Sequence, residues 1–145
     1  MSLDGAYDPD NLFARIVRGE VPAARIFEDG ETLAFMDAFP QSRGHCLVVH
    51  KSAPARNLLE VEPAPLQALI LTVQRVALAV RAALKPDGIV VTQFNGATAG
   101  QTIYHLHVHI IPRWQGVPLG RHAESGMADG VELAKLAAEI GARIA

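Results

Sequence analysis

Three of the six histidines stand at alternate positions, a spacing that would place their imidazoles on one face of an extended strand. They are His105, His107 and His109, with Leu106 and Val108 between them. Such a strand carries imidazoles on one face and aliphatic side chains on the other. A neutral imidazole is both a nucleophile and a proton carrier near neutral pH. This row of three histidines (the histidine row) therefore predicts a site that carries out a chemical reaction.

The row admits three interpretations. In the first, the histidines are half-exposed strand residues without a function. In the second, two of them share a metal ion. The outer pair is about 13 Å apart on a strand that rises ~3.3 Å per residue, so a third ligand would come from a neighbouring strand, from His45 or His50. In the third, His107 attacks phosphorus without a metal, with its Nδ1–H held by a backbone carbonyl or a second histidine and with Nε2 free.

The segment before the row favours a phosphate ligand. Residues 95–102 read NGATAGQT, which offers amide, hydroxyl and backbone donors directly before the histidines. Small polar loops are often only turns, and this one does not match the P-loop pattern. An ordinary nucleoside triphosphatase is therefore disfavoured.

The pattern of apolar residues predicts the elements that position these groups. A short helix capped by Asp8 or Asp10 stops at Gly19, and a long helix begins at Pro63 and ends near residue 84. A last helix covers about 129–144. Strands are expected at 25–28, 32–37, 45–50, 89–94 and 103–111, the first two joined by an Asp-Gly turn. We expect one domain over 1–145, of α+β class with a mainly antiparallel five-stranded sheet.

Charge and composition exclude several other classes of protein. Half of the residues are apolar and 19% are charged, and the net charge of −2 gives no general reason to bind long nucleic acid or an anionic membrane. The single cysteine, Cys46, allows no internal disulfide and excludes any zinc site that needs two cysteines of one chain. No uninterrupted apolar run reaches about 18 residues and no secretory signal begins the chain, so we expect a cytoplasmic protein.

Together, these motifs resemble the histidine triad (HIT) superfamily. Residues 105–111, HLHVHII, are similar to the triad itself. Residues 12–23, LFARIVRGEVPA, are similar to the N-terminal signature of the Hint-like branch. Residues 28–37, 44–49 and 95–104 follow in the family's order, so the resemblance spans about 11–113.

The resemblance implies a homodimer whose two five-stranded sheets join, and an enzyme that hydrolyses or transfers nucleoside monophosphates without a cofactor. His107 would attack the α-phosphorus of a purine nucleotide and form a nucleotidyl-histidine intermediate. His109 would contact the phosphate. His105 would orient the nucleophile through its backbone carbonyl, with His45 in the same hydrogen-bond network.

The resemblance also implies a substrate site. Asn95, Gln101 and Thr102 would surround the phosphate and the leaving group, and Asp37 would bind the ribose hydroxyls. The nucleoside pocket would consist of apolar residues, Phe13, Ile16, Val21, Phe35 and Leu47. From the pattern alone, the same apolar residues are also expected in an ordinary core, and Asp37 as the cap of the turn before Pro40.

One departure from the family pattern concerns zinc. Several bacterial relatives hold a structural zinc with an N-terminal Cys-x-x-Cys and a histidine after the third strand, whereas this chain has Asn11, Ala14 and Ala53 there. We therefore expect no bound metal. His50 stands where relatives often have proline and receives no role.

The histidine row and the family resemblance together predict a metal-independent nucleotide phosphoramidase, or a related nucleotidyl hydrolase, that acts at the α-phosphate of purine mononucleotide derivatives. The alternative within the superfamily is a dinucleoside polyphosphate hydrolase. The alternative outside the enzymes is a purine-nucleotide-binding or scaffold protein with little turnover.

Overall fold

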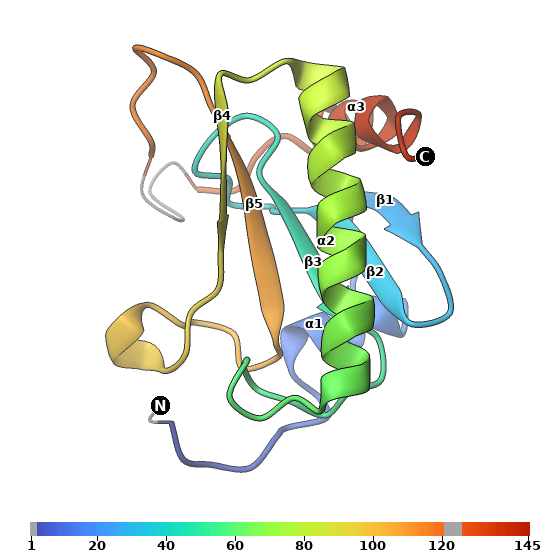
Figure 1. Ribbon diagram of the computed structural model, residues 1–145, viewed down its shortest axis with the longest axis vertical. Coiled ribbons are helices and arrows are strands. Elements are labelled where there is room, and N and C mark those ends of the chain that lie inside the picture. Colours follow the sequence, from blue (N-terminus) through green and yellow to red (C-terminus); the bar gives the residue numbers. More distant parts are fainter. Residues whose placement is uncertain (1–2, 121–125) are drawn as a thin grey trace.

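A five-stranded antiparallel sheet with the strand order β1-β2-β3-β5-β4 lies at the centre of the structure (Figure 1), a computed structural model that describes residues 3–120 and 126–145. This arrangement confirms the α+β class and the antiparallel five-stranded sheet expected from the sequence. The strands are β1 (Arg25–Glu28), β2 (Thr32–Met36), β3 (Cys46–His50), β4 (Gly88–Thr92) and β5 (His107–Arg113). The helices are α1 (Leu12–Val17), α2 (Pro63–Leu84) and α3 (Gly130–Gly141), with a 3₁₀ turn η1 (Ala97–Ala99).

Asp29 closes the hairpin between β1 and β2. Its Oδ1 accepts hydrogen bonds from the backbone N–H groups of Glu31 and Thr32 at 2.9 and 2.7 Å. A short acidic side chain that binds its own downstream backbone is a typical turn-forming device. The predicted Asp-Gly turn is confirmed, and both strands end within one residue of their expected bounds.

Helix α2 covers one face of the sheet (Figure 1). It begins at Pro63 and ends before Lys85, whose left-handed backbone (φ of 52°) stops the helix. The main core contains residues of α2, the sheet and α3, among them Leu69, Val73, Val76, Val48, Val108, Ile110, Leu136 and Ile140. By length and composition α2 could cross a membrane, with a mean hydropathy of 1.4, but the core helix of a soluble protein passes the same test.

Helix α1 packs against the opposite face and is capped by Asn11 rather than by Asp8 or Asp10, because Oδ1 of Asn11 accepts the N–H of Ala14 at 2.9 Å. A second apolar cluster lies there and contains Phe13, Ile16, Leu33, Phe35, Leu47 and Val49. Alternation along β5 directs Val108 and Ile110 toward α2 and therefore His107 and His109 toward the α1 side. The sheet thus separates the main core from the layer that holds these imidazoles.

Strand β5 begins at His107, which corrects the strand expected at 103–111. Residues 103–105 form bends, so His105 lies outside the strand and does not share a strand face with the other two histidines of the row. The cause is tertiary hydrogen bonding. Before β5 begins, the N–H of Leu106 donates to the carbonyl of Ala55 at 2.9 Å, and this bond ties the segment to the chain that follows β3.

The other bounds differ by a few residues. The sequence predicts a strand that ends at residue 111, before Pro112, yet β5 continues to Arg113, and Pro112 pairs with Ile89 of β4. A proline near the end of a strand removes only one donor from the ladder, so the pairing survives. Strand β4 covers 88–92 rather than 89–94, and α3 ends at residue 141 rather than 144.

Candidate active site

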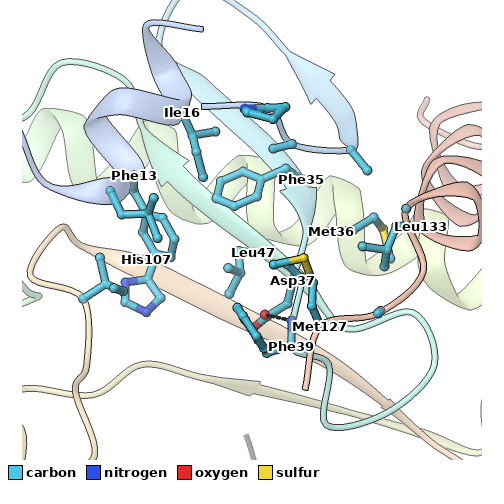
Figure 2. Close-up of a pocket in the computed structure, with 18 of the residues that line it drawn as sticks. Phe13, Ile16, Phe35, Met36, Asp37, Phe39, Leu47, His107, Met127 and Leu133 are labelled. Carbon is cyan, nitrogen blue, oxygen red and sulfur yellow. Dashed lines mark hydrogen bonds between the residues drawn. The ribbon is translucent and has the colours of Figure 1, made fainter. Parts of the chain in front are cut away.

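His107 stands at the start of β5 with its imidazole at a pocket (Figure 2). Its Nδ1 lies 2.6 Å from the backbone oxygen of His105. Because a carbonyl oxygen can only accept, the ring proton sits on Nδ1, and Nε2 keeps its lone pair in the neutral ring. This geometry suits a nucleophile, with the carbonyl of His105 as the group that orients it.

Two neighbouring rings contact the ring of His107. The ring of Phe13, from α1, meets it edge-on with centroids 4.8 Å apart, and the ring of His109 lies 5.0 Å away. Only 7% of His107 is exposed. One neighbour, Phe13, comes from α1 and the other, His109, from β5, so the helix and the sheet together fix the orientation of the nucleophile.

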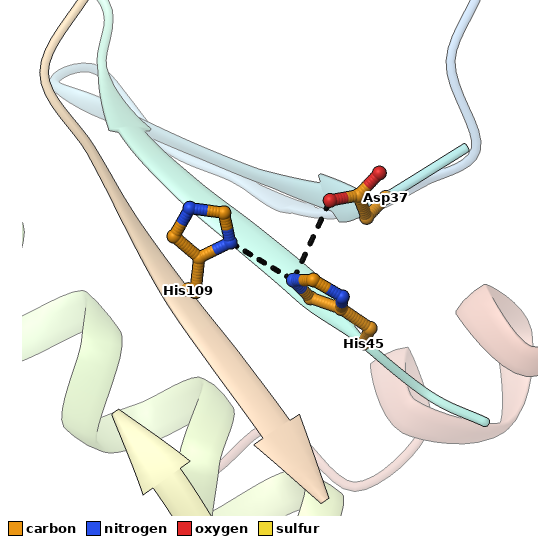
Figure 3. A group of neighbouring side chains, drawn as sticks. All are labelled: Asp37, His45 and His109. Atoms are coloured by element: carbon orange, nitrogen blue, oxygen red, sulfur yellow. Dashed lines mark hydrogen bonds and ion pairs between the residues drawn. The ribbon is translucent and has the colours of Figure 1, made fainter. Parts of the chain in front are cut away.

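His109 and His45 form a second hydrogen-bonded pair beside Asp37 (Figure 3). The N–H of Gln41 donates to Nδ1 of His45 at 3.0 Å, so the proton of the neutral His45 ring sits on Nε2. That Nε2 lies 2.9 Å from Nδ1 of His109 and 3.4 Å from Oδ2 of Asp37. His109 therefore accepts at Nδ1 and, when neutral, carries its own proton on Nε2. Neighbouring rings thus offer a lone pair, from His107, and an N–H donor, from His109.

His105 is buried, and a carbonyl holds its ring. Its Nε2–H donates to the backbone oxygen of His50 at 3.0 Å, and burial lowers the pKa of His105, which keeps it neutral at neutral pH. Nδ1 of His50 accepts the N–H groups of Ser52 and Ala53 at 3.2 and 3.0 Å. His50 therefore organises the turn after β3, a structural role that its position in the sequence did not indicate.

The pocket has a volume of about 690 Å³ and an apolar wall. Its polar lining residues in the described chain are Asp37, Thr102, His107 and His109. Four of the five residues predicted for the nucleoside pocket line it, namely Phe13, Ile16, Phe35 and Leu47. Val21 does not line it, because it packs against the apolar cluster under α1.

Asp37 directly follows β2 and is almost fully buried. Its Oδ1 accepts the N–H of Phe39 at 2.8 Å, which is the turn cap considered from the sequence. Its Oδ2 faces His45, and the residue also lines the pocket. The position of Asp37 therefore allows both predicted roles at once, the cap of the turn and a contact with the substrate.

The structure does not bring Asn95 or Gln101 to the pocket lining. The side-chain amide of Gln101 donates to the carbonyls of Arg56 and Ile103 at 2.6 and 3.1 Å, and its Oε1 accepts the N–H of Gly96 at 2.9 Å. Oδ1 of Asn95 accepts the N–H of Leu58 at 3.1 Å. Both side chains organise the loop before the histidines here, and their contact with a phosphate or leaving group stays a prediction.

One wall of the pocket was missed by the sequence reasoning. Residues of α3 and of the segment before it complete the side opposite α1, so Figure 2 shows His107 and Phe13 at one end and Leu133 at the other. The contributors are Met127, Ala128, Gly130, Leu133 and Ala134. The apolar repeat of α3 indicated a buried face but gave no sign of which cavity that face would border.

The group formed by His109, His45 and Asp37 also has the ligand types of a metal site. Asp37, His45 and His109 each offer one ligand atom, and these three atoms lie within 4.8 Å of one another. The metal interpretation expected two histidines of the row with His45 or His50 as a third ligand, whereas this group contains one histidine of the row, His45 and Asp37. A cation bound there would have to replace the proton on Nε2 of His45, and with it the hydrogen bond to His109.

Comparison with known proteins identifies the family. The sequence model of the HIT domain matches residues 18–116. The chain belongs to the HIT family, as its motifs indicated.

Three relatives show how far the likeness extends. A crystal structure of a HIT-like protein involved in cell-cycle regulation from Bartonella henselae, with an unknown ligand, is 43% identical, with a TM-score of 0.90 over 96% of this chain and 99% of that chain. A Zn-bound histidine triad family protein from Mycobacterium smegmatis is 32% identical, with a TM-score of 0.79 over 92% and 94% of the two chains. Adenylylsulfatase HINT3 of Arabidopsis thaliana is 36% identical over 79% of this chain and 60% of its own length.

Proposed function

We propose that the protein is a nucleotidyl hydrolase that acts at the α-phosphate of purine mononucleotide derivatives, with phosphoramidates as its principal substrates. One observation carries the proposal. The Nε2 of His107, unprotonated in the neutral ring, and the Nε2–H of His109 belong to rings 5.0 Å apart at the polar end of an otherwise apolar pocket. A positioned nucleophile and a donor for the phosphate oxygens are the groups that transfer at phosphorus needs.

In the first step, Nε2 of His107 attacks the α-phosphorus, and the bond from phosphorus to the amine breaks with its electron pair. The amine takes a proton from water, while the Nε2–H of His109 donates a hydrogen bond to a phosphate oxygen. The positive charge that develops on the His107 ring is stabilised through Nδ1–H by the carbonyl of His105, 2.6 Å away. In the second step, water attacks phosphorus and releases a proton to the solvent, and the bond from phosphorus to Nε2 of His107 breaks with its electron pair returning to the ring. The nucleoside monophosphate leaves, and His107 is restored.

The remainder of the pocket suits a nucleoside. Phe13 and Phe35 are aromatic residues of its apolar wall, which would bury the faces of a purine. Asp37 lines the same pocket, with Oδ2 3.4 Å from Nε2 of His45, and a carboxylate there can accept the ribose hydroxyl hydrogens. The phosphate would then lie at His107 and His109.

The charge of the pocket favours a small leaving group over a polyphosphate. None of the described residues that line it is lysine or arginine, so this lining offers no side-chain cation to the additional phosphates of a dinucleoside polyphosphate. A phosphoramidate places fewer negative charges there. The name of the Arabidopsis relative, an adenylylsulfatase, supports a test of sulfate as a second leaving group.

A substrate panel on metal-depleted protein tests the proposal. The panel compares adenosine and guanosine phosphoramidates, adenylyl sulfate and diadenosine polyphosphates, with release of the mononucleotide as the readout. We expect the phosphoramidates to give the highest kcat/KM, with no loss of activity after treatment with a chelator. Elemental analysis accompanies the assay. One zinc per chain that turnover requires would overturn the metal-free mechanism, and binding without turnover across the panel would favour the nucleotide-binding or scaffold alternative.

We also propose that the protein is a homodimer. Strand β4 forms an edge of the sheet, and its Val90 and Val91 are 38% and 49% exposed. Helix α2 exposes Ile70, Leu71 and Leu78. Apolar side chains at an unpaired strand edge favour association with another chain, and the family resemblance indicates that this chain is a second copy.

A further inference from the structure

The segment before α1 contacts the histidine row. In Figure 1 it runs beneath the end of the sheet at which β5 begins. Within it, the hydroxyl of Tyr7 lies 2.8 Å from Nδ1 of His105, and the ring centroids of these two residues are 5.7 Å apart. The side-chain amide of Asn11 lies 3.4 Å from the same nitrogen.

The hydrogen bonds of His105 fix the direction of the contact with Tyr7. Nε2 of His105 carries the ring proton, because it faces the carbonyl of His50 at 3.0 Å. Nδ1 of the neutral ring is then an acceptor. Burial raises the pKa of the Tyr7 hydroxyl, which is therefore protonated at neutral pH and donates to Nδ1. The His105 ring is thus held at both nitrogens.

The orientation of His105 reaches the nucleophile directly. The carbonyl of His105 accepts the Nδ1–H of His107 at 2.6 Å. His105 precedes β5, and its carbonyl belongs to the same peptide as the N–H of Leu106, which donates to the carbonyl of Ala55. The two hydrogen bonds of the His105 ring fix the same residue from its side chain. The ring therefore contributes to the direction in which Nε2 of His107 points.

We propose that Tyr7 is a positioning residue for the nucleophile: its hydroxyl fixes the ring of His105, and the carbonyl of His105 then directs His107 at the substrate. The inference rests on the proposed nucleotidyl transfer at His107. Tyr7 itself does not line the pocket and acts through His105.

The segment on either side of Tyr7 is anchored, as this role requires. The guanidinium of Arg56, which is 1% exposed and paired with Glu60, donates to the backbone oxygen of Leu3. On the other side, Nη1 of Arg18 donates to the backbone oxygen of Pro9 at 2.7 Å. Two arginines therefore hold the chain before and after Tyr7.

The variant Tyr7→Phe keeps the ring and removes only the hydroxyl. We expect kcat for the best substrate of the panel to fall about 2- to 10-fold, the factor that corresponds to the loss of one hydrogen bond. KM should stay within about twofold, because the pocket wall and Asp37 are unchanged. Tyr104→Phe is the matched control, because it removes the hydroxyl of the other tyrosine of the chain and keeps the ring that lies 6.0 Å from the guanidinium of Arg56. The control should keep the wild-type kcat.

A spectroscopic measurement separates positioning from a general loss of stability. Long-range ¹H–¹⁵N correlation spectra report the tautomer of each histidine and the hydrogen bonding of its unprotonated nitrogen. We expect the Nδ1 signal of His105 to move toward that of a free imine nitrogen in Tyr7→Phe and to stay in place in Tyr104→Phe. An unchanged His105 signal, or an unchanged kcat, would overturn the proposal. Wild-type protein that is inert on the whole panel would instead overturn the proposed function, while the His105 signal would still decide the contact with Tyr7.

Discussion

The three histidines of the row differ chemically because their hydrogen-bond partners differ. A carbonyl holds His105 at Nε2 and another holds His107 at Nδ1, whereas His109 accepts at Nδ1 from His45. The rings of His107 and His109 therefore present opposite groups to the pocket, a lone pair and an N–H donor. The role of each imidazole is therefore set by the hydrogen-bond partner of the ring nitrogen that faces away from the pocket, and not by the residue type.

The first residue-scale prediction concerns the nucleophile. We expect His107→Ala to lower kcat by about a thousandfold or more, because the covalent route is lost, while the dissociation constant of a nucleoside monophosphate changes by less than about threefold. Rapid-quench labelling with an α-labelled substrate should place the label on His107 of the wild-type protein.

His109→Ala is the companion variant to His107→Ala. It removes a donor to the phosphate and leaves the nucleophile, so we expect partial turnover. Wild-type rates in His107→Ala, or a label on another residue, would show that the assignment is wrong.

The second residue-scale prediction concerns pH. Burial lowers the pKa of both His50 and His105 in the folded chain, below the ordinary histidine value of 6.5. At a pH just below 6.5, these two histidines bind more protons in the unfolded chain than in the folded chain. The free energy of unfolding therefore falls as the pH drops through 6.5. We expect a lower urea midpoint at about pH 5.5 than at about pH 7.5.

His50→Gln is the matched variant for this pH effect. Glutamine keeps an acceptor for the N–H groups of Ser52 and Ala53 but does not titrate. We expect a smaller difference between the two urea midpoints in this variant. An equal or larger difference would exclude His50 as a source of the pH dependence.

At the scale of elements, the sequence predicted those helices, strands and turns that depend on residues close together in the chain. The hairpin at Asp29, the long helix α2 and the presence of five strands follow from turn chemistry and from repeats of 2 or 3.6 residues. The start of β5 could not be predicted in this way, because it depends on a hydrogen bond from Leu106 to Ala55, two residues that are 51 positions apart in the chain. The α3 wall of the pocket is also a tertiary feature, since an amphipathic repeat reveals a buried face and not its neighbour.

The element-scale prediction tests the α3 wall. Ala134 lies on an exposed part of α3 and lines the pocket, so Ala134→Phe should fill part of the nucleoside site with little cost to folding. We expect KM to rise about tenfold, which is about 1.4 kcal/mol of binding free energy, while kcat changes less.

Ala138→Phe is the control for the α3 wall. Ala138 is also exposed, lies one turn further along the same helix and does not line the pocket. Both variants should unfold at similar temperatures. Equal KM values for the two variants would place the nucleoside elsewhere.

At the scale of the whole molecule, one sheet serves two purposes. Its α1 side carries His107 and His109, and its α2 side carries the main core. Its β4 edge is not covered by another described strand. Val91 pairs with Ile110 and so lies on the α2 side of the sheet, the side from which Leu78 of α2 also projects into solvent. The apolar surface of the edge strand and that of the helix therefore occur on one side of the molecule.

The last prediction tests this surface as the contact with a second copy. Light scattering at micromolar concentration should give a mass near twice the 15.5 kDa of one chain. In Leu78→Glu, a charge at a residue that is 58% exposed should cost the folded monomer little but should oppose an apolar interface, so the mass should fall toward that of one chain. Val131→Glu is the matched control, because Val131 is 78% exposed at the start of α3, and this variant should keep the wild-type mass. A wild-type mass near 15.5 kDa, or a Leu78→Glu mass equal to that of Val131→Glu, would exclude this face as the interface.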